Sequence, residues 1–159
     1  MPKIEIAFET FATVDDLPLA DKALVDMAKE ATRTAYAPYS NFWVGVAVLL
    51  SNGTITKGSN QENAAYPSGL CAERVAFFNI GVMFPTETIV AVAVVARGAN
   101  EVQFTPVTPC GACRQVMVEY EQKQHVPIRI IFQDLDKQYY ILPNITSLLP
   151  FQFSALNLK

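Results

Sequence analysis

The three cysteines of this chain lie in two short motifs whose spacing is typical of metal binding. The first motif is Cys71-Ala-Glu-Arg, and the second is Pro-Cys110-Gly-Ala-Cys113-Arg. Each motif predicts the start of a helix, where unpaired backbone amides and the positive end of the helix dipole lower the pKa of a thiol. Three thiolates from two helix starts predict a zinc site with one coordination position left open.

An acidic residue stands where a metal-assisted hydrolysis needs a proton carrier. Glu73 follows Cys71 by two residues, so its carboxylate can serve the open coordination position with protons. Taken alone, Glu73 would be an acid that the helix dipole stabilises, but its place beside a metal ligand favours the catalytic interpretation. Arg74 and Arg114 each lie within one turn of a cysteine, and we expect both to donate hydrogen bonds to the sulfurs.

Two other interpretations of the cysteines are weaker. A closed, four-ligand zinc site would need His125, the only histidine, but a helix over residues 110–123 would place it roughly 18 Å along the axis from Cys113, at about 1.5 Å per residue. We therefore expect His125 to be exposed near a helix C-terminus. A redox dithiol of the thioredoxin kind would employ only the second motif and leave the first unexplained.

Hydrophobic periodicity predicts the elements that position these motifs. Segments with apolar residues at helical spacing alternate along the chain with short apolar runs, and an Asn-Gly dipeptide indicates a hairpin between the first two runs. This alternation implies a mixed sheet with helices on both faces. The expected elements are a helix at about 19–35 with Asp16 as N-cap, strands at 42–50 and 54–57, helices at 71–82 and 110–123, strands at 88–96, 128–132 and 139–142, and a short terminal helix at 142–149.

Composition limits the class of protein. The 159 residues are 51% hydrophobic, which is typical of a globular domain with a substantial core, and we assign residues 1–159 to a single domain. A net charge of -3 argues against a phosphate-binding surface, so we expect no nucleic-acid partner. No apolar run has the length of a membrane span, and the N-terminus does not resemble a signal peptide. We therefore expect no membrane partner, a cytoplasmic location and reduced thiols.

Four ordered motifs carry a resemblance to a known family. The chain resembles the small, homotetrameric cytidine deaminases of pyrimidine salvage from about Tyr36 to Phe153. This resemblance implies a three-layer α/β/α fold with a mixed five-stranded sheet, one Zn2+ per subunit and a homotetramer. A cysteine in place of histidine in the first zinc motif indicates the nucleoside branch. The matching stretches are APYSNFWVG (37–45), NQENAAY (60–66), CAER (71–74) and PCGACRQV (109–116).

About 15 residues precede the part of the chain that the family shares. In this extension, residues 1–15, the side chains of Ile4, Ile6 and Phe8 alternate with charged or small residues. Alternation of this kind predicts an added edge strand.

The resemblance also implies roles for individual residues. Water activated by the zinc attacks C4 of cytosine, and Glu73 protonates N3 and then the departing ammonia. Asn60 and Glu62 bind the ribose 3'-hydroxyl, and Phe42, which is equally expected in a strand core, packs against the pyrimidine. The other implied contacts come from the backbone of Ala72 and, across a subunit contact, from Ala64, Tyr66 and Phe153, with Phe151 as an alternative to Phe153.

Together these observations predict zinc-dependent hydrolytic deamination of cytidine and deoxycytidine. The carboxylate of Glu62 would repel a 5'-phosphate, which favours a free nucleoside as the small-molecule substrate. Deamination of a related aminopyrimidine nucleoside such as blasticidin S is an alternative with the same chemistry. A noncatalytic, zinc-stabilised interaction module is the alternative from a different class, and it leaves Glu73 without a role.

Overall fold

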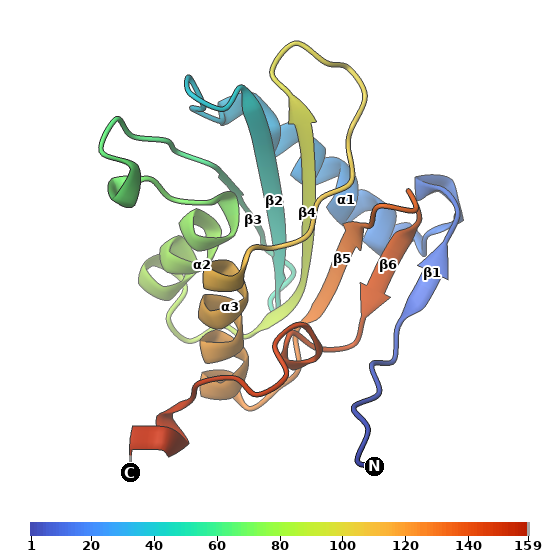
Figure 1. Cartoon of the computed structure of the whole chain (residues 1–159), viewed down its shortest axis with the longest axis vertical. Coiled ribbons are helices and arrows are strands. Elements are labelled where there is room, and N and C mark those ends of the chain that lie inside the picture. Colours follow the sequence, from blue (N-terminus) through green and yellow to red (C-terminus); the bar gives the residue numbers. More distant parts are fainter. Residues whose placement is uncertain (159) are drawn as a thin grey trace.

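The computed structural model describes residues 1–158, which form a mixed β-sheet with helices packed on its two faces (Figure 1). The sheet has six strands in the order β1-β6-β5-β4-β2-β3. Short 3-10 turns connect several of the elements. The main helices and strands are β1 (Glu9–Phe11), α1 (Leu19–Ala31), β2 (Phe42–Leu50), β3 (Ile55–Ser59), α2 (Ala72–Met83), β4 (Ile89–Gly98), α3 (Gly111–Gln124), β5 (Arg129–Gln133) and β6 (Tyr139–Leu142).

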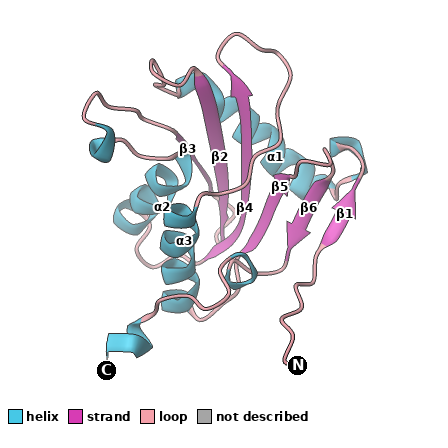
Figure 2. Cartoon of the chain, in the orientation of Figure 1, coloured by secondary structure: helices cyan, strands magenta, loops and turns pink. Residues whose placement is uncertain are grey.

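The helices divide between the two faces of the sheet. One face is covered by α1, and α2 and α3 lie side by side on the other (Figure 2). Side chains of the central strands alternate accordingly, because Val46 and Val94 face α2 and α3 whereas Ala47 and Ala93 face α1. The predicted three-layer α/β/α architecture is confirmed. Within residues 1–158, no helix has both the length and the apolar composition needed to cross a bilayer.

The strand connections confirm the predicted hairpin and mixed sheet. β2 and β3 pair antiparallel through the turn that contains Asn52 and Gly53, where Gly53 has a φ of 84°. This left-handed conformation carries little cost for glycine. β4 and β5 pair in parallel, and α3 forms the crossover between them. The crossover places the start of α3 beside the start of α2.

The expected count of five strands is wrong by one, because the N-terminal extension adds a strand to the sheet. β1 pairs antiparallel with β6, with Thr10 opposite Tyr140. The alternation of Ile4, Ile6 and Phe8 predicts this strand too early in the chain, since β6 is short and offers pairing only to residues 9–11. Ile4 and Ile6 are exposed, and the ring of Phe8 stacks on that of Tyr140 with centroids 4.9 Å apart.

The first helix differs from its prediction at both ends. Asp16 is not its N-cap: Pro18 occupies that position, and Asp16 forms a capping box with Thr13 in a preceding 3-10 turn. α1 ends at Ala31 and continues as a 3-10 turn at Thr32–Thr34. The hydroxyl of the first residue of this turn donates to a carbonyl of the preceding helical turn, a local bond that competes with regular helix.

The chain after β6 turns back along α3. The short helix expected at 142–149 is present only as a 3-10 turn at Thr146–Leu148, because β6 already includes Leu142. Leu148 and Leu149 pack against the core that α2 and α3 share with the sheet. The chain after β6 therefore lies against α3, the helix that carries the second cysteine motif.

A glycine in the edge strand β3 allows this strand to approach the start of α2. A Cβ atom on Gly58 would lie 2.5 Å from the carbonyl oxygen of Ala72 and 2.8 Å from the amide nitrogen of Ala76. Any larger residue would therefore displace the helix. The contact fixes the helical turn that carries Glu73 and follows Cys71.

Candidate metal centre and active site

The three cysteines meet where α2 and α3 begin. Cys71 is the N-cap residue of α2, Cys110 is the N-cap residue of α3, and Cys113 lies in the first turn of α3. The Sγ atom of Cys110 lies 3.9 Å from that of Cys71 and 3.5 Å from that of Cys113. All three sulfurs lie within 4.8 Å of one another. The two helix starts thus bring together the residues that the motifs single out.

The sulfur positions fit a tetrahedral zinc ion. With Zn–S bonds of about 2.3 Å, tetrahedral geometry separates two sulfur ligands by about 3.8 Å, close to both of these distances. Among the described residues, no histidine or carboxylate joins the cluster as a fourth donor. His125 is the exposed C-cap residue at the far end of α3. The donor set therefore leaves one position for a ligand from outside the protein, as in catalytic zinc sites.

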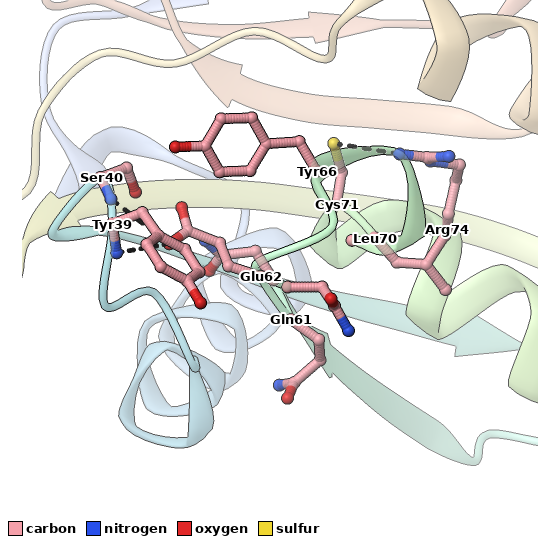
Figure 3. Close-up of a pocket in the computed structure, with 11 residues that line it drawn as sticks. Tyr39, Ser40, Gln61, Glu62, Tyr66, Leu70, Cys71 and Arg74 are labelled. Carbon is pink, nitrogen blue, oxygen red and sulfur yellow. Dashed lines mark hydrogen bonds between the residues drawn. The ribbon is translucent and has the colours of Figure 1, made fainter.

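Arg74 stabilises negative charge on the cluster. Its guanidinium donates a hydrogen bond to the Sγ atom of Cys71 over 3.6 Å (Figure 3). Hydrogen bonds from Cys113 and from Arg74 lower the pKa of Cys71 to about 5. The hydrogen bond with Cys71 raises the pKa of Cys113, and burial raises it further. Protein groups alone thus favour the thiolate at Cys71 over the thiolate at Cys113, and the positive charge of a bound dication would favour thiolates at both.

Glu73 lies in the first turn of α2, next to the cluster, and the residue is only 4% exposed. Burial raises the pKa of its carboxyl, and the negative charge of Cys71 raises the pKa further. A hydrogen bond from its own backbone amide, and then contacts with Cys113 and Arg74, oppose this rise. A raised pKa makes this carboxylate a better proton acceptor than an ordinary glutamate, and the acid that it forms can release the proton again. The arrangement can therefore move protons beside a bound metal ion.

Arg114 differs from its prediction. Its place after Cys113 predicts a hydrogen bond to sulfur, but its Nε donates to the carbonyl oxygen of Pro109 at 2.7 Å and its Nη1 donates to that of Leu148 at 3.0 Å. Side chains on a helix tilt toward its N-terminus, so this side chain reaches back over the loop that precedes Cys110. A backbone carbonyl is also a stronger acceptor than a thiol sulfur.

A hollow of about 510 Å³ opens beside the cluster (Figure 3). It joins residues from the end of the loop before β2, the loop after β3 and the start of α2. Of the six lining residues that sequence reasoning did not single out, four lie within the matching stretches 37–45 and 60–66, and two lie between 60–66 and 71–74, so the stretches themselves were the available signal. The lining consists of the predicted site residues Asn60, Glu62, Tyr66, Cys71 and Arg74, and of Tyr39, Ser40, Gln61, Asn63, Gly69 and Leu70.

Glu62 presents a fixed carboxylate to this hollow. Its Oε2 accepts hydrogen bonds from the backbone amides of Tyr39 at 2.9 Å and Ser40 at 3.3 Å (Figure 3). Hydrogen bonding from the side chain of Ser40, followed by the two backbone amides, lowers the pKa of Glu62. The group is therefore ionised at neutral pH, with its second oxygen available to a ligand hydroxyl.

Asn60 is held by the strand beside it. Its Oδ1 accepts from the amide of Val44 at 2.8 Å, and its Nδ2 donates to the carbonyl oxygen of Phe42 at 2.9 Å. These two bonds fix the orientation of the amide and tie the loop after β3 to the first residues of β2. One amide hydrogen and one lone pair of Asn60 are left over from these bonds.

Four predicted substrate contacts lie outside the lining of the hollow. Phe42 begins β2 and, by strand alternation, points to the same face as Val44, the face that α2 and α3 cover. Ala72 is buried at the first position of α2. Ala64 is exposed, and Phe153 is 58% exposed. Their roles toward a substrate stay predictions.

An open zinc position with a buried proton carrier beside it is what metal-assisted hydrolysis requires, and within this α/β/α fold it defines the class of zinc-dependent deaminases. The family model described as "Cytidine and deoxycytidylate deaminase zinc-binding region" matches residues 19–128. This chain belongs to that family.

Individual relatives agree with the family assignment. The cytidine deaminase of Sporosarcina psychrophila is 47% identical over 97 residues, which cover 61% of this chain and 67% of the relative. That of Halalkalibacterium halodurans is 46% identical over 96 residues, covering 60% and 68%. The crystal structure of cytidine deaminase from Burkholderia pseudomallei has a TM-score of 0.68 at 36% identity and covers 82% of this chain and 97% of its own. The predicted resemblance is confirmed.

Proposed function

We propose that this chain catalyses zinc-dependent hydrolytic deamination of cytidine and deoxycytidine to uridine and deoxyuridine. The observation that carries the proposal is the place of Glu73, a buried carboxyl in the helical turn that follows the first cysteine of the cluster. A noncatalytic zinc module would have no use for this group. The curated relatives are cytidine deaminases, which favours cytidine over other aminopyrimidine nucleosides.

The reaction replaces the exocyclic amine at C4 of the pyrimidine with oxygen from water. Cys71, Cys110 and Cys113 would hold the zinc ion, which supplies Lewis acidity that activates the attacking water. Glu73 accepts one proton from this water and donates it to N3, then accepts the second proton from the new hydroxyl at C4 and donates it to the amine, which departs as ammonia. Arg74 keeps electron density on Cys71 low by its hydrogen bond to the sulfur. Burial of Glu73 keeps bulk water away from these transfers.

The substrate is a free nucleoside in this proposal. Glu62 is ionised and offers one carboxylate oxygen to the hollow, which suits a sugar hydroxyl and opposes a phosphate. Among the described lining residues the only cation is Arg74, and its guanidinium bonds Cys71. Salvage of free nucleosides and reduced zinc-binding thiols both fit a cytoplasmic location.

We expect Glu62→Gln to lower kcat/KM for cytidine about 10- to 100-fold while zinc content stays at one per chain. A hydrogen bond to a charged group contributes about 1.5–3 kcal/mol, and glutamine keeps an acceptor for the loop amides that Glu62 now bonds. Steady-state kinetics on cytidine and cytidine monophosphate give the measurement, with the exposed Glu119→Gln as matched control. Equal efficiency of the parent on nucleoside and monophosphate would contradict the free-nucleoside proposal.

We propose in addition that the enzyme is a homotetramer. The solvent face of α2 exposes Phe78, Val82 and Met83, which are 44%, 77% and 63% exposed. Apolar side chains gathered on one helix face mark an interaction surface in soluble proteins. Tyr66 lines the hollow and is 75% exposed, so a second copy packed nearby would shield the hollow from water. The predicted role of Phe153, or of Phe151, which is 94% exposed, is to cap the site of an adjacent subunit, and this role also requires a second copy.

We expect light scattering coupled to chromatography to report about four chains per particle for the parent. Val82→Glu should yield smaller particles with a lower kcat/KM, because a charge on the apolar face of α2 opposes its burial. Leu135→Glu is the matched control, since Leu135 is 86% exposed on the turn between β5 and β6. A parent that is a fully active monomer at assay concentration would contradict the proposed assembly.

A further inference from the structure

Arg114 connects two segments of the chain that are distant in sequence. It follows Cys113 in α3, and its guanidinium donates to the carbonyl oxygen of Pro109 at 2.7 Å and to that of Leu148 at 3.0 Å. Pro109 is buried and immediately precedes Cys110. The arginine therefore joins the loop that leads into the metal centre to the C-terminal segment, which we define as residues 144–148.

A buried carboxylate holds the other end of this segment. Glu121, two turns after Arg114 in α3, is 7% exposed. It accepts hydrogen bonds from the backbone amides of Ile145 at 2.8 Å and Thr146 at 3.0 Å, and from the hydroxyl of Thr146 at 2.6 Å. A further bond comes from the amide of Ile128 at 2.8 Å, where β5 is about to begin. The C-terminal segment thus has an anchor on α3 that is independent of Arg114.

We propose that Arg114 is a positioning residue of the metal centre, which holds the backbone before Cys110 in place by tying it to the anchored C-terminal segment. The inference rests on the proposed function only in requiring that the three cysteines bind zinc. In this proposal the C-terminal segment helps to hold the loop that precedes Cys110.

The covalent structure of the loop makes this tie effective. The ring of Pro109 fixes its φ, so the position of its carbonyl group depends mainly on ψ, and that group sets the direction of the chain into Cys110. The guanidinium is a rigid, planar fork, so its two bonds fix the Pro109 carbonyl relative to the Leu148 carbonyl. Cys110 is the most exposed of the three cysteines, and other packing restrains it less.

The test is the release of zinc from Arg114→Met, measured as the rate of transfer to a chromogenic chelator. Groups that orient metal ligands typically contribute about 10- to 100-fold to metal affinity, and we expect zinc release to accelerate by about that factor. We also expect the absorption bands of the Co2+-substituted protein to shift, because the position of the Cys110 sulfur changes. Arg114→Lys should restore part of the retention, since an ammonium can bond one carbonyl but cannot provide the fork.

Two controls separate positioning from general destabilisation. Gln115→Ala removes a hydrogen bond from the neighbouring residue to the carbonyl oxygen of Phe153, without touching Pro109. Val25→Ala weakens the core on the α1 face, away from the metal centre. Both variants should release zinc at the parental rate, even where Val25→Ala lowers the melting temperature as much as Arg114→Met does.

A double variant tests the route through the C-terminal segment. Glu121→Gln weakens the anchor of this segment, so this single variant should release zinc faster than the parent. The double variant should release zinc at nearly the same rate as Arg114→Met, because Arg114→Met has already removed the tie between Pro109 and Leu148. Zinc release at the parental rate in Arg114→Met would overturn the proposal. Equal acceleration in Val25→Ala would overturn it too, as would independent multiplication of the two effects in the double variant.

Discussion

Glu73→Gln should bind one zinc per chain and fold as the parent does, yet lose turnover by a factor near the upper end of the range of about 100- to 10,000-fold that general acid-base steps contribute. The amide is nearly isosteric with the carboxyl but cannot accept a proton from water or deliver one to N3 and to ammonia. One residue serves all of these transfers in the proposed mechanism, which places the expected effect at the high end. The measurement is single-turnover conversion of cytidine, followed by absorbance.

The control for this variant is Glu119→Gln, an exposed glutamate on α3 away from the cluster, which should leave turnover unchanged. Zinc analysis and a melting curve should show that Glu73→Gln differs from the parent in neither metal content nor fold. A Glu73→Gln rate within tenfold of the parental rate would assign the proton transfers to another group and remove the central support of the proposed mechanism.

The cysteine cluster could be predicted from sequence because its geometry is local to two helix starts. Cys71 and Cys110 are N-cap residues, and the spacing from Cys110 to Cys113 is one helical turn, so each motif fixes its own sulfur directions. The position of Glu73 could be predicted in the same way, because its offset of two residues from Cys71 places it in the first turn of α2. To bring the two motifs together, one further inference is needed, namely that the two helices are adjacent. The crossover rule for parallel strands supplies this inference.

Contacts between segments distant in sequence were harder to predict. Arg114 lies one residue from a ligand, which favoured a bond to sulfur, but its acceptors are carbonyls of Pro109 and Leu148. Nothing in the motif indicates that residue 148 returns to α3. The lining of the hollow shows the same limit, because Tyr39 and Ser40 are brought there by bonds to a segment more than 20 residues away, including the bonds of their amides to Glu62.

Strand boundaries depend on partners in the same way. The strand β6 was predicted with its observed bounds because its own residues form a short apolar run between turns. The alternation of Ile4, Ile6 and Phe8 predicts the strand of the N-terminal extension near these residues, but within the extension β6 pairs only with residues 9–11. Alternation shows that a segment can form a strand, whereas register is set by the partner edge.

Removal of Cys113 should have the second large effect. Cys113 is fully buried, and without its thiolate Cys71 and Cys110 offer only two ligands, so Cys113→Ala should retain less than roughly a tenth of the zinc and show no measurable turnover. The fold should suffer as well. Structural zinc sites in small peptides contribute about 10–16 kcal/mol, and even part of this is large beside a total stability of about 5–15 kcal/mol.

Metal analysis and melting curves check this expectation, and chelation of the parent separates the two causes of lost stability. If zinc is the cause, the parent stripped of metal should melt close to Cys113→Ala, and added zinc should raise the melting temperature of the parent alone. Ala112→Ser, a change in the exposed part of the same helical turn, should behave as the parent with zinc. One zinc per chain with parental turnover in Cys113→Ala would show that the three-thiolate site is not the metal centre, since no other described residue could replace the lost ligand without rearrangement of the two helix starts.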